Sequence, residues 1–181
     1  MALDGPISID DARLHMRVDT RSEDENIGRL IRVAARQIET VYSVVSVRRE
    51  VTFVFDRFTP EVRLPLIPVQ PDSITLSYLD PHGEYQPFAD FRAVTRHDWT
   101  WISPAVGACW PTPACVPGAI TVTASVGFVD PEAELQEQLR QSPEDLQQAA
   151  RLVVEHLYRR MPGDLPEGVD ALVGHYRYLR L

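Results

Sequence analysis

The sequence predicts an α+β protein with a four-helix bundle core, formed by N- and C-terminal helix pairs, and an inserted small antiparallel β subdomain. Three observations predict this class. Apolar residues recur at helical spacing near the N-terminus, alternate at strand spacing in the middle of the chain, and return to helical spacing after Gly127. The predicted domains are therefore a helical bundle core over residues 1–47 and 129–181, and a β subdomain over residues 48–128.

The N-terminal pair is predicted to be a short helix over residues 7–19 and a long helix over residues 23–45. Ser8 stands where a side chain can accept a free backbone N–H at the start of the first helix. Ser22 and Glu25 have the spacing of a capping box before the second helix. The long helix carries one apolar stripe, which must be buried against other elements.

In the middle of the chain, residues 48–58 alternate, with Val51, Phe53 and Phe55 on one face of the expected strand. Asp80–Gly83 has the composition of a hairpin turn. The prolines of the intervening segment suit an edge strand or a connection. Further strands are expected over residues 73–80, 84–88, 91–95, 99–102 and 119–126.

The C-terminal pair is predicted to start at Ser142 and Pro143, with Ser142 as the helix cap and Pro143 in the first turn. The apolar stripe of this helix ends at Leu157, and a last helix is predicted from about residue 168 onward. Residues 131–140 have the pattern of a short acidic helix, to which the sequence assigns no role. Packing the C-terminal helices against the N-terminal pair would complete the bundle.

The chain of 181 residues has a net charge of −8, and all 18 of its basic residues are arginine. That balance argues against a protein that reads nucleic-acid sequence, which needs a basic surface. No apolar run is long enough for a membrane span, and the N-terminus has no features of a secretory signal, so we expect a cytosolic protein. In that compartment Cys109 and Cys115 are expected to be free thiols.

The sequence holds no recognisable catalytic, cofactor-binding or metal-binding motif, and we expect no enzymatic activity and no cofactor. His97 and Asp98 beside Trp99 are more simply a strand end with packed aromatic side chains. Acidic pairs at helix starts are explained by the helix dipole without a metal. A binding module in which the β subdomain holds a small ligand or a glycan near Trp99, Trp101 and Trp110 stays open as an alternative.

Three stretches of the chain carry a resemblance to a known family. Residues 9–19 and 27–39 are similar to that family's opening helix pair, residues 120–128 to its strand ending in Gly-Tyr or Gly-Phe, and residues 149–160 with 166–177 to its last two helices. In the order and spacing of these stretches the chain resembles the head–tail connector (adaptor) proteins of long-tailed bacteriophages and of phage-like gene transfer agents.

The resemblance implies a structural role without catalysis or a cofactor. The family forms a ring, commonly of about twelve copies, below the portal protein in the neck of a virion or gene transfer agent particle, after assembly in the bacterial cytoplasm. The ring extends the channel for double-stranded DNA, which passes without sequence-specific binding, and joins the capsid to the stopper, head-closure or tail protein. No membrane partner is implied. Another neck or tail-completion protein is the nearest alternative.

The resemblance also points to individual residues. The family's C-terminal segment commonly engages the portal, and by position this segment here is Tyr176, Arg177, Tyr178, Leu179, Arg180 and Leu181. An acidic channel lining would repel DNA from the wall. The candidates for that lining are Glu23, Asp24, Glu25, Glu132, Glu134 and Glu137. The chain departs from the family at Val173, where a leucine is usual, and in residues 132–142, which are longer and more acidic.

Overall fold

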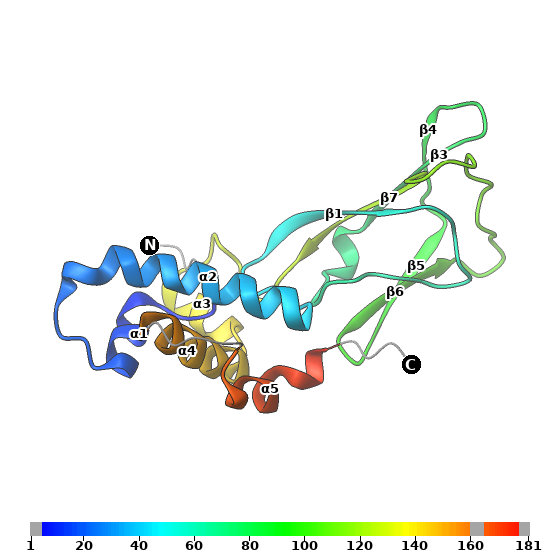
Figure 1. Cartoon of the computed structure of the whole chain (residues 1–181). Coiled ribbons are helices and arrows are strands. Elements are labelled where there is room, and N and C mark those ends of the chain that lie inside the picture. Colours follow the sequence, from blue (N-terminus) through cyan, green and yellow to red (C-terminus); the bar gives the residue numbers. More distant parts are fainter. Residues whose placement is uncertain (1–4, 160–164, 178–181) are drawn as a thin grey trace. The chain divides into compact units, whose positions relative to one another are not determined.

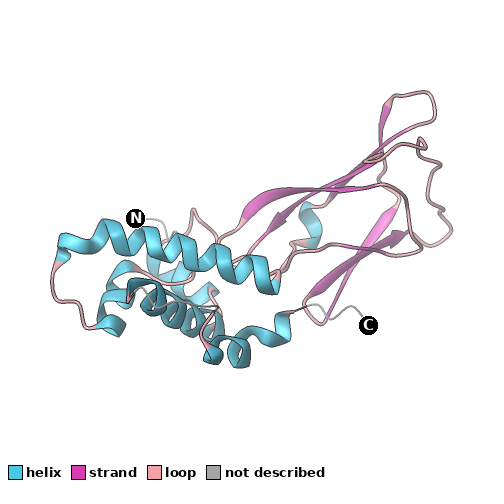
Figure 2. Cartoon of the chain, viewed as in Figure 1, coloured by secondary structure: helices cyan, strands magenta, loops and turns pink. Residues whose placement is uncertain are grey.

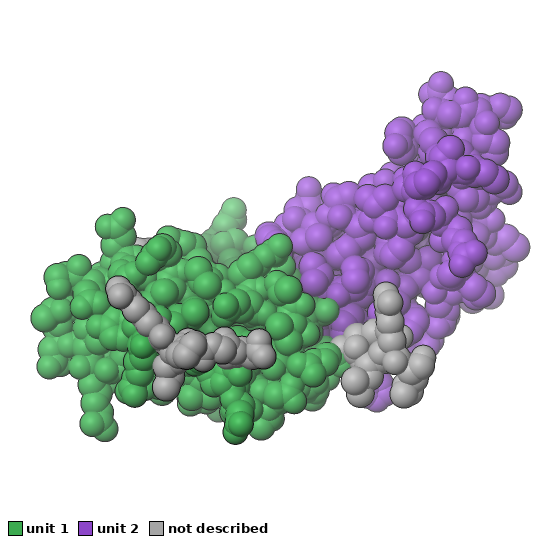
Figure 3. Space-filling model, in the orientation of Figure 1, with its two compact units in different colours: residues 1–48, 127–181 green, residues 49–126 purple. Residues whose placement is uncertain are grey.

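A computed structural model describes residues 5–159 and 165–177 of the chain. Within these residues there are five α-helices and two antiparallel β-sheets (Figure 1, Figure 2). The chain divides into two compact units, Met1–Arg48 with Gly127–Leu181, and Arg49–Val126 (Figure 3). We refer to them as the helical unit and the strand unit. No helix of the described residues is both long and apolar enough to span a membrane.

The predicted fold class, a four-helix bundle core with a small β insertion, is wrong. The helical unit contains a further helix, α3 (Leu135–Gln141), and the middle of the chain folds into two sheets rather than a small insertion. Alternating apolar residues identify strands, but the number of sheets depends on pairing between segments that are distant in sequence. The predicted domain boundaries, at residues 47/48 and 128/129, stay a prediction.

The helical unit is built on α2 (Asp24–Tyr42) and α4 (Glu144–Tyr158), which pack against each other. α1 (Ile9–Met16) packs against both helices, and α5 (Glu167–Val173) packs against α4. Each fully buried aliphatic side chain contributes about 1.5–3 kcal/mol through its removal from water. The buried stripes are Ile27, Ile31, Ala34, Ile38 and Tyr42 on α2, and Leu146, Ala149, Ala150, Val153 and Val154 on α4.

The helix starts agree only in part with the predictions. The Ser8 hydroxyl accepts the backbone N–H of Asp11 at 3.1 Å, which confirms the predicted cap of α1. The predicted capping box of Ser22 and Glu25 is wrong. The chain instead enters α2 through a 3₁₀ turn, η1 (Arg21–Glu23), whose last residue is the N-cap of α2 without a side-chain hydrogen bond.

The strand unit contains a larger sheet with the order β1-β7-β3-β4 and a smaller sheet with the order β2-β6-β5, both antiparallel. A 3₁₀ turn, η2 (Pro71–Ser73), precedes β3. The strands are β1 (Arg49–Phe55), β2 (Val62–Arg63), β3 (Thr75–Leu79), β4 (Tyr85–Pro87), β5 (Phe91–Arg96), β6 (Trp99–Pro104) and β7 (Ile120–Val126).

The larger sheet has one buried face, which gives the strand unit a core of its own. In β7 every second residue from Ile120 to Val126 is buried. Val122 lies opposite Phe53 of β1 and Leu76 of β3, and both of these side chains are buried as well. Other buried aliphatic side chains of this unit are Val62, Leu64, Ile67, Val69, Ile74 and Ile102.

Candidate interaction sites

The C-terminal turn η3 (Gly174–Tyr176) holds the first of the residues predicted to meet a portal. Only 6 % of Tyr176 is exposed, and its ring lies edge-on to that of Phe128 with 6.2 Å between centroids. The Tyr176 hydroxyl is 3.4 Å from one carboxylate oxygen of Asp145, and Nε2 of His175 is 3.3 Å from the other. Tyr176 therefore anchors this end of the described chain in the helical unit.

A second set of contacts holds Arg177. Its guanidinium is 3.0 Å from Asp170 and lies over the Tyr42 ring, 4.9 Å from the centroid. The Tyr42 hydroxyl donates to the same Asp170 carboxylate at 3.3 Å. Burial raises the pKa of Tyr42, the negative charge of Asp170 raises it further, and the positive charge of Arg177 opposes both effects. The end of α2 and the middle of α5 thus clamp Arg177 together.

These contacts bear on the predicted portal interface. Tyr176 and Arg177 are held to the helical unit, so they determine where the next residues of the chain begin. The remaining four predicted residues, Tyr178, Leu179, Arg180 and Leu181, lie outside the described residues. A portal interface in this segment stays a prediction.

The first acidic group predicted for the channel lining is Glu23, Asp24 and Glu25, at the start of α2. Two of these three carboxylates have partners within the chain. Asp24 is 3.6 Å from Arg13. Glu23 accepts a hydrogen bond from the Tyr158 hydroxyl, and this bond raises the pKa of Tyr158. Glu25 is exposed, and no described residue pairs with it. Of these three carboxylates, Glu25 has the least compensated charge.

The second acidic group surrounds the start of α3. Glu132, Glu134 and Glu137 are all exposed. Glu137 is 3.5 Å from the side-chain nitrogen of Gln141, which is neutral and leaves the charge uncompensated. No cation within the described ranges pairs with any of the three. This group therefore suits an acidic lining better than the first group does, and its place on a channel wall stays a prediction.

A buried glutamine, Gln138, and a half-buried one, Gln141, hold this acidic segment in place. Only 1 % of Gln138 is exposed, and its amide nitrogen donates to the carbonyls of Pro131 and Ala133 at 3.0 and 2.8 Å. The side-chain oxygen of Gln141 accepts the backbone N–H of Asp130 at 2.6 Å. Sequence reasoning missed this arrangement, because glutamine is ordinarily exposed and nothing in the pattern marks these two as structural supports.

One ion pair and one histidine–carboxylate contact join α1 to α4. Asp11 is 2.8 Å from Arg151, and His15 is 3.0 Å from Glu155, with about a quarter of each side chain exposed. Arg159 extends this row of contacts and lies 2.6 Å from Glu155. Each polar group here has an intramolecular partner, so the row serves the packing of α1 on α4.

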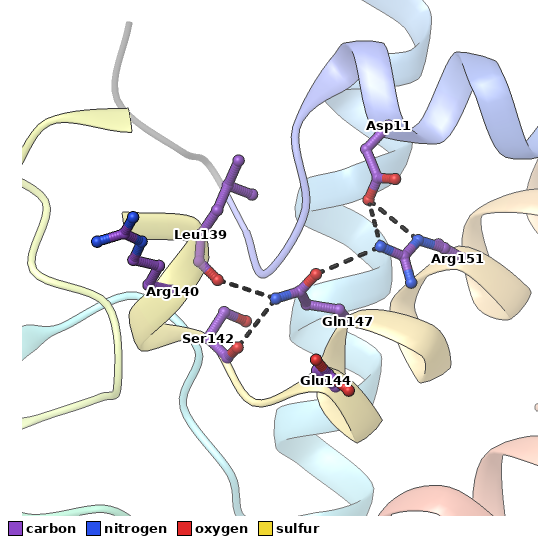
Figure 4. A pocket seen from close by; sticks show the side chains of 7 residues that line it. All are labelled: Asp11, Leu139, Arg140, Ser142, Glu144, Gln147 and Arg151. Carbon is purple, nitrogen blue, oxygen red and sulfur yellow. Dashed lines mark hydrogen bonds and ion pairs between the residues drawn. The ribbon is translucent and has the colours of Figure 1, made fainter. Parts of the chain in front are cut away.

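An open pocket of about 490 Å³ borders this row (Figure 4). Arg151 contacts Asp11 and Gln147 within it, and Gln147 donates to the Ser142 carbonyl at 2.9 Å. The prediction that Ser142 caps α4 is wrong, because Pro143 is the N-cap and the buried Ser142 hydroxyl has no hydrogen-bond partner among the described residues. That hydroxyl has no base within hydrogen-bond distance, so the pocket offers no activated nucleophile. Its lining is Asp11, Leu139, Arg140, Ser142, Glu144, Gln147 and Arg151.

The tryptophans of the strand unit are engaged in internal packing. The Arg63 guanidinium lies 4.8 Å from the ring centroid of Trp99, which is 8 % exposed, and 5.9 Å from that of Trp101. Trp110 stacks on Phe58 with 4.4 Å between centroids. Each contact covers one face of an indole ring and reduces the surface open to a sugar, which weakens the ligand-binding alternative.

His97 and Asp98 form the two-residue turn between β5 and β6. Their φ values of 49° and 67° are left-handed, as a tight hairpin turn requires. Among the described residues, no group of three or more histidine, cysteine or acidic side chains is placed to hold a metal ion. Cys109 and Cys115 are free and exposed.

Three solved structures contain chains similar to this one. A chain in the neck of an empty gene transfer agent particle, computed with C6 symmetry, has a TM-score of 0.78 and 24 % identity, over 100 % of this chain and 94 % of that chain. A chain in the virion of a native gene transfer agent particle has a TM-score of 0.75 and 23 % identity, over 100 % of this chain and 94 % of that chain. A chain in the neck of a native particle, computed with C12 symmetry, has a TM-score of 0.73 and 24 % identity, over 96 % and 89 %. No protein-family model and no curated protein matches.

The fold defined by the two units is therefore shared with chains of gene transfer agent particles, two of them from the particle neck. The resemblance to head–tail connector proteins is confirmed as a likeness of fold over the whole chain.

Proposed function

We propose that the chain is a structural neck component of a phage-like particle, and specifically the adaptor that forms a ring below the portal and joins the capsid to the stopper or tail. The observation that carries the proposal is the fold match to two neck chains, over 100 % and 96 % of this chain. Those necks were computed with C6 and C12 symmetry, which supports copies repeated around an axis. The role requires neither catalysis nor a cofactor.

The negative charge of the chain is consistent with double-stranded DNA passing through such a ring. Each copy carries a net charge of −8, and a ring multiplies it. A wall that presents Glu132, Glu134 and Glu137 without paired cations repels phosphates and neutralises none of them. DNA then moves through the channel without sequence-specific binding.

The C-terminal segment supplies the portal contact in this proposal. Tyr176 and Arg177 fix the base of the segment on the helical unit, which lowers the entropy that the remaining residues lose on docking. Tyrosine and arginine are also the residue types that most often dominate interface energies. The assembled ring lies in the particle neck, after synthesis and assembly in the bacterial cytoplasm.

Deleting the gene in the bacterium that encodes it tests the proposal. We expect DNA-filled heads without joined tails, seen by electron microscopy, and recovery of tailed particles when the wild-type gene is supplied on a plasmid. Normal tailed particles from the deletion strain would show that the proposal is wrong.

The position of the protein in the particle separates the adaptor from another neck or tail-completion role. In cryo-electron microscopy of particles that carry a tagged copy, we expect the added density directly below the portal. Density at the distal end of the neck or on the tail tube would favour the alternative.

A further inference from the structure

The larger sheet of the strand unit has a second face, opposite its buried one. We call it the hydroxyl face and define it by Thr52 and Val54 of β1, Thr75 and Ser77 of β3, and Thr121 and Thr123 of β7. The register places Thr123 between Thr52 and Thr75, and the hydroxyls of Thr52 and Thr123 are 3.2 Å apart. All six side chains are exposed or half-buried.

The hydroxyl face is almost without charge. On the four strands of this sheet, Glu50 at the start of β1 is the one charged residue that shares the face. No aspartate, glutamate, arginine or lysine occurs from Trp99 to Val129, the stretch that includes β7. In a chain of net charge −8, a solvated sheet face of this composition needs an explanation.

Exposed apolar side chains extend the hydroxyl face at one end. Val54 is 60 % exposed and Tyr85 is 67 % exposed. Tyr85 lies opposite Leu79, two residues after Ser77, so it belongs to the same face. Tyrosine supplies a large contact area with a polar tip and is enriched in protein–protein interfaces. The face thus combines rows of hydroxyls with two apolar anchors.

We propose that a second copy of this chain docks on the hydroxyl face, an inference that rests on the ring assembly proposed above. Two copies that each carry a net charge of −8 repel where charged surfaces meet, and such like-charge contacts cost several kcal/mol in an interface. A face without charges avoids this cost. Hydroxyls donate and accept, so they can pair with groups of either kind. The β-branched threonines also lose little rotamer freedom on contact.

The size of the face predicts a weak pairwise contact. Four strands about 4.8 Å apart, with about six residues at 3.3 Å each, cover roughly 400 Å². A stable interface buries about 800 Å² on each partner, so the face supplies about half of that area. Copies are therefore expected to associate weakly in solution and to be held in a ring when several contacts act together.

DNA is disfavoured as the occupant of this face. Binding to the phosphate backbone depends on lysine and arginine side chains that replace counterions. The hydroxyl face carries neither residue type, and its one charge, on Glu50, would repel phosphates.

Sedimentation equilibrium of the full-length chain tests the inference. Val54→Glu places a charge at the apolar end of the hydroxyl face and is expected to lower the self-association constant about tenfold or more. Val41→Glu on α2 is the matched control, because Val41 is 41 % exposed and the substitution changes the net charge equally. The control is expected to change the constant much less.

A cross-linking experiment tests the same interface without measuring a self-association constant. With a photoreactive p-benzoylphenylalanine in place of Val54, mixed isotope-labelled and unlabelled copies should give cross-links between copies. Equal effects of the two glutamate substitutions, a wild type that stays monomeric at millimolar concentration, or a duplex DNA fragment that protects position 54 would each overturn the inference. The two proposals can fail separately. If the gene is required for tail joining but the Val54→Glu variant self-associates normally, this interface is wrong and the proposed function still stands.

Discussion

Tyr42 connects parts of the helical unit that are far apart in the sequence. It is the last residue of α2 and is 2 % exposed, and its hydroxyl donates to Asp170 of α5 at 3.3 Å. Asp170 in turn pairs with Arg177 at 3.0 Å. The apolar spacing of α2 predicts that Tyr42 is buried, but no local pattern reveals a partner 128 residues away.

Replacing Tyr42→Phe should expose the energetic role of this hydroxyl. We expect the free energy of unfolding to fall by about 0.5–1.5 kcal/mol near pH 7, because one hydrogen bond is lost and the ring is kept. Urea denaturation followed by circular dichroism measures the change. Tyr85→Phe is the control, because Tyr85 is 67 % exposed and its hydroxyl is solvated.

The pH dependence of the same variant gives a second readout. The pKa of Tyr42 in the folded chain lies above the ordinary tyrosine value of 10.0, so the folded state keeps a proton that the unfolded state releases. The stability from this difference is fully present below pH 10 and is lost as the pH rises through the folded pKa. The wild type should therefore lose stability more steeply above pH 10 than Tyr42→Phe does, and equal slopes would contradict the prediction.

At the scale of elements, periodicity located most helices and strands. The stripes of α2 and α4 and the alternation of β1 and β7 lie where the sequence places them, because these segments have regular spacing and one-sided burial. The sequence predicts α3 as a short acidic helix. It does not predict that Gln138 of this helix is buried and holds the preceding loop by hydrogen bonds, because that depends on tertiary packing. The capping errors have the same origin, since Ser22 bonds to Thr20 instead of the helix backbone.

Gly127, after the end of β7, is the element boundary with the strictest backbone requirement. Its φ is +133°, and a Cβ there would lie 2.5 Å from the Cα of Arg48 and 2.7 Å from the carbonyl carbon of Val47. Real side chains do not tolerate such distances to backbone atoms, so any substitution must move the chain. This gives a physical reason for glycine at a position on which the family resemblance partly rests.

Gly127→Ala is expected to lower the free energy of unfolding by about 2–5 kcal/mol, through backbone strain together with overpacking. Gly83→Ala is a matched control, because Gly83 also has a positive φ, of 88°, but its Cβ would meet nothing within 4 Å. The control should cost only about 1–2 kcal/mol of strain. Thermal unfolding of the two variants measures the difference, and similar losses in both would show that steric contact at Gly127 is unimportant.

At the scale of the whole molecule, the two units divide the proposed tasks. The helical unit anchors the C-terminal segment and presents Glu132, Glu134 and Glu137, whereas the strand unit provides the hydroxyl face. The chain as a whole is acidic and has no lysine, although residues 99–129 carry no charged side chain. Only the fold distributes that charge so that one sheet face is nearly neutral.

A chain that ends at Arg177 tests the predicted portal contact. It keeps the contacts of Tyr176 with Asp145 and of Arg177 with Asp170, so we expect it to fold with a thermal midpoint close to that of the full chain. Removing residues 178–181 should nevertheless abolish co-purification with the portal protein of the same particle. Retained binding by this shortened chain would place the portal contact elsewhere on the protein.

The sequence by itself determined the order of helices and strands, the buried stripes, the acidic balance and the order of motifs on which the family resemblance rests. These properties depend on local spacing, which the 3.6-residue and two-residue periods report directly. The tertiary structure decided the pairing of seven strands into two sheets, the burial of Gln138 and the clamp of Tyr42, Asp170 and Arg177. Those features depend on residues that are distant in sequence, and only the folded chain brings such residues within hydrogen-bonding distance.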